Sequence, residues 1–209
     1  MANPDDDIPS GIDFRDPAGV AKWLETAETK PGRIAIRQQI ADLLRDRCPT
    51  PTRVLELGTG PGWLAETILG ACTVSSYTLF DHSPTFLDMC RERLAHSAVT
   101  RYVLGDFKEN PSWPSLVEPP FHAVVTMQAV HELRHKRHAV TLYRQVLPLL
   151  ERRGLLIVCD SNPGTDARSL ALHASDAEQR EALTAAGFTD VELNLVDYGK
   201  YIVSARRPS

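Results

Sequence analysis

The stretch of sequence that decides the fold reads Val54-Leu55-Glu56-Leu57-Gly58-Thr59-Gly60-Pro61-Gly62-Trp63-Leu64. Its apolar start predicts a buried strand, three glycines at alternate positions predict a turn, and a helix is expected from Trp63. Glycine lets a backbone turn tightly and approach a ligand closely, while the first turn of a helix presents unpaired N–H groups. The pattern therefore predicts a strand–turn–helix unit suited to a small ligand, although a purely structural glycine turn has the same sequence.

Short apolar runs and helical periods continue to alternate after this unit. We expect strands at residues 53–57, 75–80, 99–104, 121–127, 154–159, 191–196 and 201–205. We expect helices at residues 63–69, 84–95, 133–150 and 176–186. Such alternation is typical of a parallel sheet, but the four residues 197–200 are too few for a parallel crossover, so the last two strands must be antiparallel. The predicted fold class is α/β: a doubly wound, mostly parallel seven-stranded sheet with helices on both faces, an antiparallel C-terminal strand and additional N-terminal helices.

The first fifty residues precede the alternating pattern. Residues 1–11 are polar and contain prolines, which predicts a disordered arm. Asp16-Pro17 opens one expected helix, and a second is expected to end at Cys48-Pro49, because proline disfavours the helical region in the residue before it. We therefore divide the chain into residues 1–51, an N-terminal arm and helical lid, and residues 52–209, the ligand-binding domain.

Composition narrows the class of protein. The chain has 209 residues, is 43% apolar, and carries 23 Lys and Arg against 27 Asp and Glu. A net charge of −4 gives no clear nucleic-acid footprint, and no apolar run approaches the roughly 18 residues needed to span a membrane. The four cysteines lack C-x-x-C spacing, which favours buried thiols over a disulfide or zinc framework. A cytoplasmic protein is expected, and the oligomeric state is left open.

Two acidic residues narrow the class of ligand. Asp81 follows the second strand, 23 residues after Gly58, and a carboxylate there can accept hydrogen bonds from the ribose hydroxyls of an adenosine-containing ligand. Its alternative role is to cap the helix that begins at Pro84. The spacing G-x-G-x-G differs from the dinucleotide pattern G-x-G-x-x-G. Glu56 would repel a pyrophosphate but can hold a positively charged amino group, directly or through water.

Together these residues resemble the first motif of the class I S-adenosylmethionine-dependent methyltransferases. The resemblance covers residues 52–208. In that family an acidic residue after the third strand, here Asp106, pairs with the adenine amino group, and its neighbour Phe107 helps to frame the ring. The family also lines the methyl donor with residues after the fourth strand, here Met127-Gln128-Ala129-Val130. The resemblance thus identifies residues 52–209 as a methyltransferase domain with S-adenosyl-L-methionine as its cofactor.

The resemblance implies a set of cofactor-binding residues: Glu56, Gly58, Thr59, Gly60, Gly62, Asp81, His82, Asp106, Phe107 and Gln128. The fourth strand is followed neither by an Asn/Asp-Pro-Pro-aromatic sequence nor by Pro-Cys, which the branches that methylate base amino groups and cytosine carbon carry. The sequence instead resembles the small-molecule branch. A small-molecule acceptor methylated on an O, N or S atom is expected, and protein or RNA acceptors stay open.

A second motif competes with this interpretation. His131-Glu132-Leu133-Arg134-His135 matches H-E-x-x-H, in which two histidines on one helix face bind zinc and the glutamate acts as general base. Here, however, the motif directly follows a strand, and the basic residues around it oppose a dication. We therefore expect no metal ligands, and we expect His135 and His138 to lie on a solvated basic face. A zinc-dependent hydrolase is kept as an alternative, as is a methyltransferase-like protein that binds the cofactor without turnover.

His131 itself lies just beyond the carboxyl end of the fourth strand, where open α/β sheets place ligand-facing groups. An imidazole there can take a proton from a hydroxyl, amine or thiol, so His131 is the candidate catalytic base. Its alternative role is a loop histidine that only supports packing. The segment Asp160-Ser161-Asn162-Pro163, after the fifth strand, either presents polar side chains to the pocket or forms a plain loop.

Overall fold

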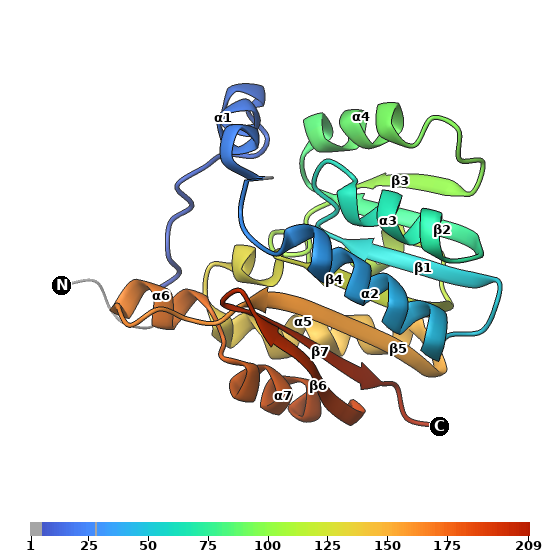
Figure 1. Cartoon of the computed structure of the whole chain (residues 1–209). Coiled ribbons are helices and arrows are strands. Elements are labelled where there is room, and N and C mark those ends of the chain that lie inside the picture. The colour runs from blue at the N-terminus through green and yellow to red at the C-terminus, as the bar shows by residue number, and fades with distance from the viewer. Residues whose placement is uncertain (1–5, 28) are drawn as a thin grey trace.

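The computed structural model describes residues 6–27 and 29–209. Its strands form a seven-stranded sheet in the order β3-β2-β1-β4-β5-β7-β6 (Figure 1). The strands are β1 (Thr52–Leu57), β2 (Val74–Asp81), β3 (Thr100–Leu104), β4 (Phe121–Met127), β5 (Leu150–Ser161), β6 (Thr189–Asp197) and β7 (Lys200–Arg206). Neighbours among β1–β5 are parallel, whereas β7 runs antiparallel to both β5 and β6. The predicted fold class is confirmed, including its antiparallel end.

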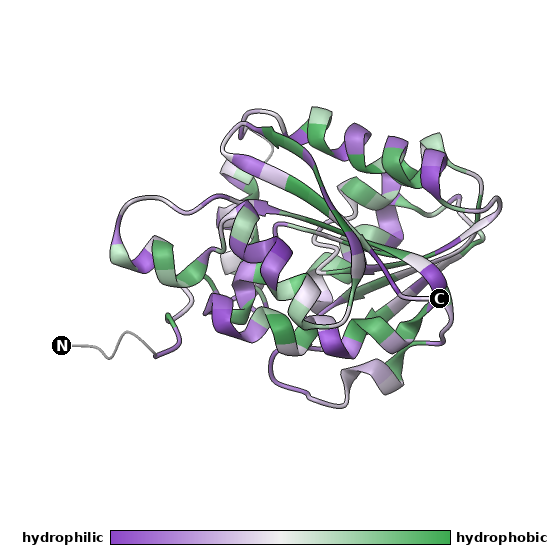
Figure 2. Cartoon of the chain, turned by 90° about the horizontal axis from the view of Figure 1, so that it is seen from below, coloured by the Kyte–Doolittle hydropathy of each residue, from purple (hydrophilic) through white to green (hydrophobic). Residues whose placement is uncertain are grey.

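Helices cover both faces of the sheet. One face carries α2 (Arg33–Arg47), α3 (Trp63–Ala71) and α4 (Pro84–Arg93), and the other carries α5 (Ala139–Val146) and α7 (Asp176–Ala185). Successive strand residues point to opposite faces, so Val54 packs into the first apolar layer and Leu55 into the second. Figure 2 shows largely green strands between helices that alternate green and purple, as expected for amphipathic helices on a buried sheet.

Helix ends follow local sequence signals. The Ser83 side chain accepts a hydrogen bond from the Phe86 N–H and so caps α4. A capping box of Ser175 and Glu178 starts α7. Gly187, with φ of 100°, follows α7 and allows the chain to turn into β6, as the sequence predicts.

The segment after β4 differs from the expectation of one helix over residues 133–150. It contains the short 3-10 turns η2 (Val130–Leu133) and η3 (Lys136–His138), then α5, then η4 (Leu147–Leu149). Arg134 has a left-handed backbone with φ of 68°, and His135 is extended, so a continuous helix is impossible there. The sequence also did not predict η1 (Trp113–Leu116) or α6 (Ala167–Leu172).

The N-terminal segment is placed on the body of the protein. Residues 1–5 of the expected disordered arm lie outside the described residues, but residues 6–15, called the arm below, have defined contacts. The Ile8 N–H donates to the Arg134 carbonyl at 2.8 Å, and the Arg134 guanidinium donates to the Ile8 and Pro9 carbonyls at 2.7 and 2.9 Å. The expectation of disorder is therefore wrong for residues 6–11, because hydrogen bonds between Arg134 and the backbone of Ile8 and Pro9 place this segment on the body of the protein.

The arm leads into α1 (Pro17–Ala27), the first of the two expected N-terminal helices. Figure 1 places α1 and α6 beside the sheet edge at which the arrows of β1, β3 and β5 end. In the described part of the chain, none of the helices combines the length and the apolar character that a membrane crossing requires.

Candidate functional site

A cavity of about 590 Å³ lies where β1, β2 and β4 end. Its volume is in the range typical of small-molecule sites. The glycine turn and the loop after β4 form its walls, while the arm and Trp23 of α1 line its remaining side. The residues predicted to bind the cofactor line it, as does His131, with one difference: Gly62 is not part of the lining. The fold thus brings together groups that are spread over 76 positions of sequence, from Glu56 to His131.

Gly58, Gly60 and Gly62 have different structural roles in the glycine turn. All have positive φ, at 69° for Gly58, 54° for Gly60 and 83° for Gly62. A Cβ on Gly58 would lie 2.3 Å from the Ala129 Cβ, so this glycine lets the loop after β4 pack closely. A Cβ on Gly60 would meet nothing within 4 Å, so this part of the turn is open. Gly62 instead precedes α3 and packs near Cys90.

Asp81 ties the end of β2 to the glycine turn. One carboxylate oxygen, Oδ2, accepts from the Gly60 N–H at 2.8 Å, and Oδ1 accepts from the Ser83 N–H at 2.9 Å. Burial raises the pKa of Asp81, while the backbone donors oppose this rise. Ser83, rather than Asp81, supplies the side-chain cap of α4. Each carboxylate oxygen retains a second lone pair for a ligand hydroxyl.

Glu56 lies at the end of β1 and is almost fully buried. Its Oε2 accepts a hydrogen bond from the Tyr77 hydroxyl at 2.7 Å. Burial raises the pKa of Glu56 to about 8, although the bond from Tyr77 lowers it. A carboxyl of this kind in a cavity wall would be stabilised in its ionised form by a cation inside the cavity. The donor set therefore fits a ligand with a charged amino group.

Two arginines of the same cavity were missed by sequence reasoning. Arg33 and Arg37 lie one helical turn apart on α2 and are both buried to about 7% exposure. Their guanidinium carbons lie 5.7 Å from the Trp23 ring and 5.8 Å from the Trp63 ring, respectively. The sequence contains only a weak signal for these two residues, because two arginines spaced four residues apart on a helix usually indicate a solvent-exposed helix face.

Asp106 and Phe107 form the wall that follows β3. Asp106 Oδ1 accepts from the backbone N–H groups of Lys108 and Glu109 at 2.8 and 3.1 Å. Its Oδ2 pairs with the Arg15 guanidinium at 2.6 Å, so a residue of the arm reaches this end of the cavity. Phe107 lies near Gly58, across from the glycine turn.

Aromatic side chains hold α1 over the cavity. The Trp23 ring stacks on the Trp63 ring with centroids 6.0 Å apart, and Phe14 packs against Phe86 at 5.6 Å. His82, predicted to bind the cofactor, contacts Phe14 edge-on at 6.2 Å. In contrast, Tyr198 and Tyr201 of the C-terminal hairpin do not line the cavity.

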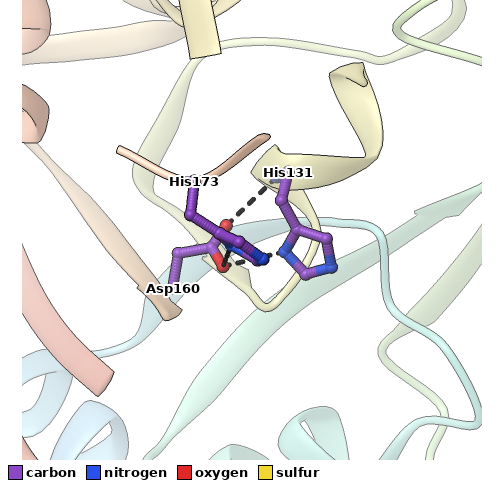
Figure 3. A group of neighbouring side chains, drawn as sticks. All are labelled: His131, Asp160 and His173. Carbon is purple, nitrogen blue, oxygen red and sulfur yellow. Dashed lines mark hydrogen bonds and ion pairs between the residues drawn. The ribbon is translucent and has the colours of Figure 1, made fainter. Parts of the chain in front are cut away.

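His131 forms a pair with Asp160, which stands at the end of β5 (Figure 3). His131 Nδ1 lies 2.8 Å from Asp160 Oδ1, and the His131 backbone N–H donates to Oδ2 at 3.1 Å. Gln128, whose backbone has φ of 59°, donates to Oδ1 at 3.4 Å. Asp160, inside the end of β5, thus presents its carboxylate to His131, whereas none of the residues 160–163 lines the cavity itself.

Two carboxylates surround the His131 imidazole. Burial alone would lower its pKa, but the charges and hydrogen bonds of Asp160 and Glu132 raise it to about 10. Burial would likewise raise the pKa of Asp160, but the His131 imidazolium holds it well below its usual range. In the resting protein at neutral pH, His131 therefore carries a proton and Asp160 is ionised.

The zinc-hydrolase geometry does not form. His135 lies beyond the left-handed Arg134, where its Nδ1 accepts from the Arg137 N–H and its ring contacts His138. Glu132 pairs with His131 and Arg134. The two histidines of the motif do not share a helix face, because the helix that would align them is absent. His131 instead lies next to His173, a residue that sequence reasoning did not single out.

Comparisons with known proteins agree with this architecture. Residues 54–154 match a family model described as a methyltransferase domain. The 5-methylorsellinic acid synthase of Aspergillus terreus is 25% identical over 103 residues, which are 47% of this chain and 4% of that protein. The chain therefore spans only a small part of this curated relative.

Solved structures resemble nearly the whole chain. The structure of human N-acetylserotonin methyltransferase in complex with SAM has a TM-score of 0.69 at 16% identity, covering 94% of this chain and 58% of that one. The CurJ carbon methyltransferase has a TM-score of 0.71 at 16% identity, covering 94% and 59%. The chain thus spans less than two thirds of either structure, and at these identities the likeness concerns the fold.

Proposed function

Because the chain has the fold of the class I methyltransferases and its residues 54–154 match a methyltransferase domain, we propose that it transfers a methyl group from S-adenosyl-L-methionine to an O, N or S atom of a small molecule. The observation that carries this proposal is a single cavity lined both by the glycine turn with its acidic partners and by His131. The proposed cofactor site and the proposed proton acceptor would thereby share one cavity.

The chain's own residues match the parts of the cofactor. Glu56 would hold the amino group, and Arg33 and Arg37, which line the same cavity, would face the carboxylate of the same amino acid tail. Asp81 would accept from the ribose hydroxyls, and Asp106 with Phe107 would hold the adenine. When bound, the cofactor supplies an electrophilic methyl group on a sulfonium. The protein contributes mainly by positioning the two reactants and excluding water.

His131 would remove the proton of the acceptor. Asp160 fixes the orientation of the imidazole through Nδ1 and stabilises the imidazolium, while Nε2, which lies 3.4 Å from Glu132 Oε1, would be the nitrogen that accepts the proton. Because His131 is protonated at neutral pH in the resting protein, the fraction able to act as base grows as the pH rises toward about 10. An acceptor that arrives already ionised would need no base, and its anion would be stabilised by the imidazolium.

A carbon acceptor is a second candidate. One solved structure of this fold is named as a carbon methyltransferase, and the curated relative is named as a synthase of 5-methylorsellinic acid. A C–H group is far less acidic than a hydroxyl, so it would depend more strongly on His131. Exchange of the acceptor's C–H for deuterium, measured without methyl donor, would occur for a carbon acceptor and not for an O, N or S acceptor.

Binding calorimetry with S-adenosylmethionine and S-adenosylhomocysteine tests the cofactor assignment. Methyl transfer from radiolabelled cofactor to a panel of phenols, amines, thiols and β-keto acids then tests turnover. The absence of binding at millimolar cofactor would overturn the proposal. Tight binding without transfer to any acceptor would instead support the alternative of a cofactor-binding protein without turnover.

The remaining expectations also stand as proposals. Residues 1–51 would act as the arm and helical lid of a methyltransferase domain over residues 52–209, supported by the contacts of the arm and α1 with the cavity. A cytoplasmic location is supported by the four cysteines, which form no disulfide bonds with one another. Burial raises the pKa of the Cys48 and Cys90 thiols, so both stay protonated at neutral pH.

A further inference from the structure

His173 is a partly buried residue that the proposed mechanism does not use. It follows the last residue of α6, and its ring centroid lies 4.9 Å from that of His131 (Figure 3). Its Nδ1 is shielded from solvent and has no hydrogen-bond partner among the described residues. Buried polar atoms are nearly always satisfied, so a lone imidazole nitrogen beside a catalytic candidate requires an explanation.

The acceptor that Nδ1 faces is Asp160 Oδ1, 3.7 Å away. This oxygen already accepts from His131 Nδ1 at 2.8 Å and from the Ser161 N–H at 2.7 Å. Gln128 Nε2 also donates to this oxygen at 3.4 Å, so a bond from His173, which lies within about an ångström of hydrogen-bond distance, would be the fourth to the same oxygen. A small movement of the ring would make that bond, in competition with the bond from His131.

We propose that His173 is a positioning residue that acts through Asp160: by sharing Oδ1 with His131, it sets how tightly His131 holds its proton. This inference rests on the proposed role of His131 in methyl transfer. His173 contacts His131 but does not line the cavity in which the acceptor would bind. In the step it would modulate, the acceptor's proton would move to Nε2 of the neutral form of His131, the acceptor's freed electron pair would form the bond to the methyl carbon, and the electron pair of the broken carbon–sulfur bond would stay on sulfur.

The direction of the effect follows from the charges around His131. Asp160 of β5 and Glu132 of η2 both favour the imidazolium form of His131. Arg134 forms an ion pair with Glu132 Oε2 at 3.0 Å and so offsets part of the Glu132 charge. A donated bond from His173 disperses charge on Asp160 and so weakens its hold on the His131 proton. The hydroxyls of Tyr143 on α5 and Tyr201 on β7 also sense the Asp160 charge, but they bond to Gln179.

The test is a nitrogen-15 NMR titration of the His131 ring in the full-length protein without acceptor. His173→Leu removes the donor and keeps an apolar side chain of similar size. His173→Asn places an amide nitrogen near the position of Nδ1. We expect His173→Leu to increase the proton affinity of His131 about three- to tenfold, and His173→Asn to return it toward the wild-type value. His96→Leu, outside the cavity lining, is the matched control and should change nothing.

Three results would overturn the inference: an unchanged titration midpoint in His173→Leu, an equal shift in the control, or no recovery in a folded His173→Asn. A fourth comes from a metal titration, because ligand-type atoms of His131, Asp160 and His173 lie within 4.8 Å of one another. Stoichiometric Co²⁺ binding that His173→Leu abolishes would replace a proton-tuning role with a metal site. Since none of these measurements needs turnover, failure of the proposed methyl transfer would leave the coupling itself tested.

Discussion

At the scale of single residues, Glu56 links cofactor binding to pH. Burial raises its pKa to about 8, so the resting protein at pH 7 holds it mostly protonated. A cationic amino group beside it would favour the carboxylate, and binding at pH 7 should therefore release close to one proton. Affinity should weaken up to about tenfold for each pH unit below 8.

Calorimetry in two buffers of different ionisation enthalpy measures this proton directly. The apparent binding enthalpies should differ in wild type and coincide in Glu56→Gln, which cannot ionise and should bind more weakly. Buffer-independent enthalpies in the wild type would place the amino group elsewhere.

Asp81 is the second acidic residue with a predicted effect. Asp81→Ala removes both the acceptor for ribose hydroxyls and the tie to the Gly60 N–H, so cofactor affinity should fall roughly 10- to 100-fold. Asp88→Ala is a suitable control, since Asp88 is an exposed residue of α4 that pairs only with Arg91 among the described residues. Equal cofactor affinity in Asp81→Ala and wild type, measured by calorimetry, would refute the ribose assignment.

Sequence reasoning found those residues whose role depends on local spacing. Glu56, Gly58 and Gly60 stand in one short stretch, and Asp81 follows at a distance typical of the fold, so each could be placed without tertiary information. Asp160 was only an open alternative and His173 was missed, because they meet His131 through the association of β5 and α6 with the loop after β4. No local sequence pattern predicts the contacts of His131 with Asp160 and His173.

At the scale of elements, the arm depends on Arg134. This guanidinium donates to the carbonyls of Ile8 and Pro9, and its left-handed backbone aims it toward them. Arg134→Ala should release the arm from the loop after β4, which would raise the acceptor KM more than it lowers kcat. Hydrogen exchange of the amide groups in residues 6–15 should accelerate by at least about tenfold.

Arg101→Ala, a change on β3 that breaks the exposed ion pair between Arg101 and Glu118, serves as the control and should leave exchange in the arm unchanged. If the arm exchanged equally slowly in Arg134→Ala, its anchoring would have to come from other contacts, such as the pairing of Asp7 with Arg137.

The start of α2 is held by the C-terminal hairpin. Gly32 has φ of 77°, and a Cβ there would lie 2.1 Å from the Tyr198 ring. Gly32→Ala should lower the free energy of unfolding by about 2 kcal/mol, from left-handed strain and the displaced ring together. Adding Tyr198→Ala should recover only the steric part, because the strain remains. Urea unfolding of the single and double variants measures both parts, and strict additivity would disprove the contact.

The loop after β4 contains the position at which the predicted helix over residues 133–150 was wrong. Strands were predictable because short apolar runs end at glycines or acids, and the antiparallel end followed from the short link over residues 197–200. A helix over residues 133–150 was expected because its residues favour helices locally. The reversal at Arg134 is stabilised by bonds to the arm, more than a hundred residues earlier, and local propensity cannot register such a partner.

At the scale of the whole molecule, buried ionisable groups determine how stability depends on pH. Glu56 has a pKa raised from 4.5 to about 8, so its contribution is full below pH 4.5 and is lost as the pH rises through 8. His131 has a pKa raised from 6.5 to about 10, so its contribution is lost between those values. Asp160 has a lowered pKa, so its contribution is lost on acidification. Stability of the ligand-free protein should therefore be greatest in mildly acidic solution.

This balance predicts that the cofactor stabilises the protein most where the free protein is weakened. From pH 5.5 to 8.5 the Tm of the ligand-free protein should fall, since ionising Glu56 places an uncompensated charge in the core. Saturating S-adenosylhomocysteine, which retains the amino group, should raise Tm more at pH 8.5 than at pH 5.5, because its ammonium compensates that charge. In Glu56→Gln both dependences should flatten, leaving only the decline above pH 6.5 that His131 causes. A Tm that rises steadily from pH 5.5 to 8.5 in the ligand-free wild type would show that Glu56 is already neutralised by a cation of the protein, and the site would then have no need of a charged amino group.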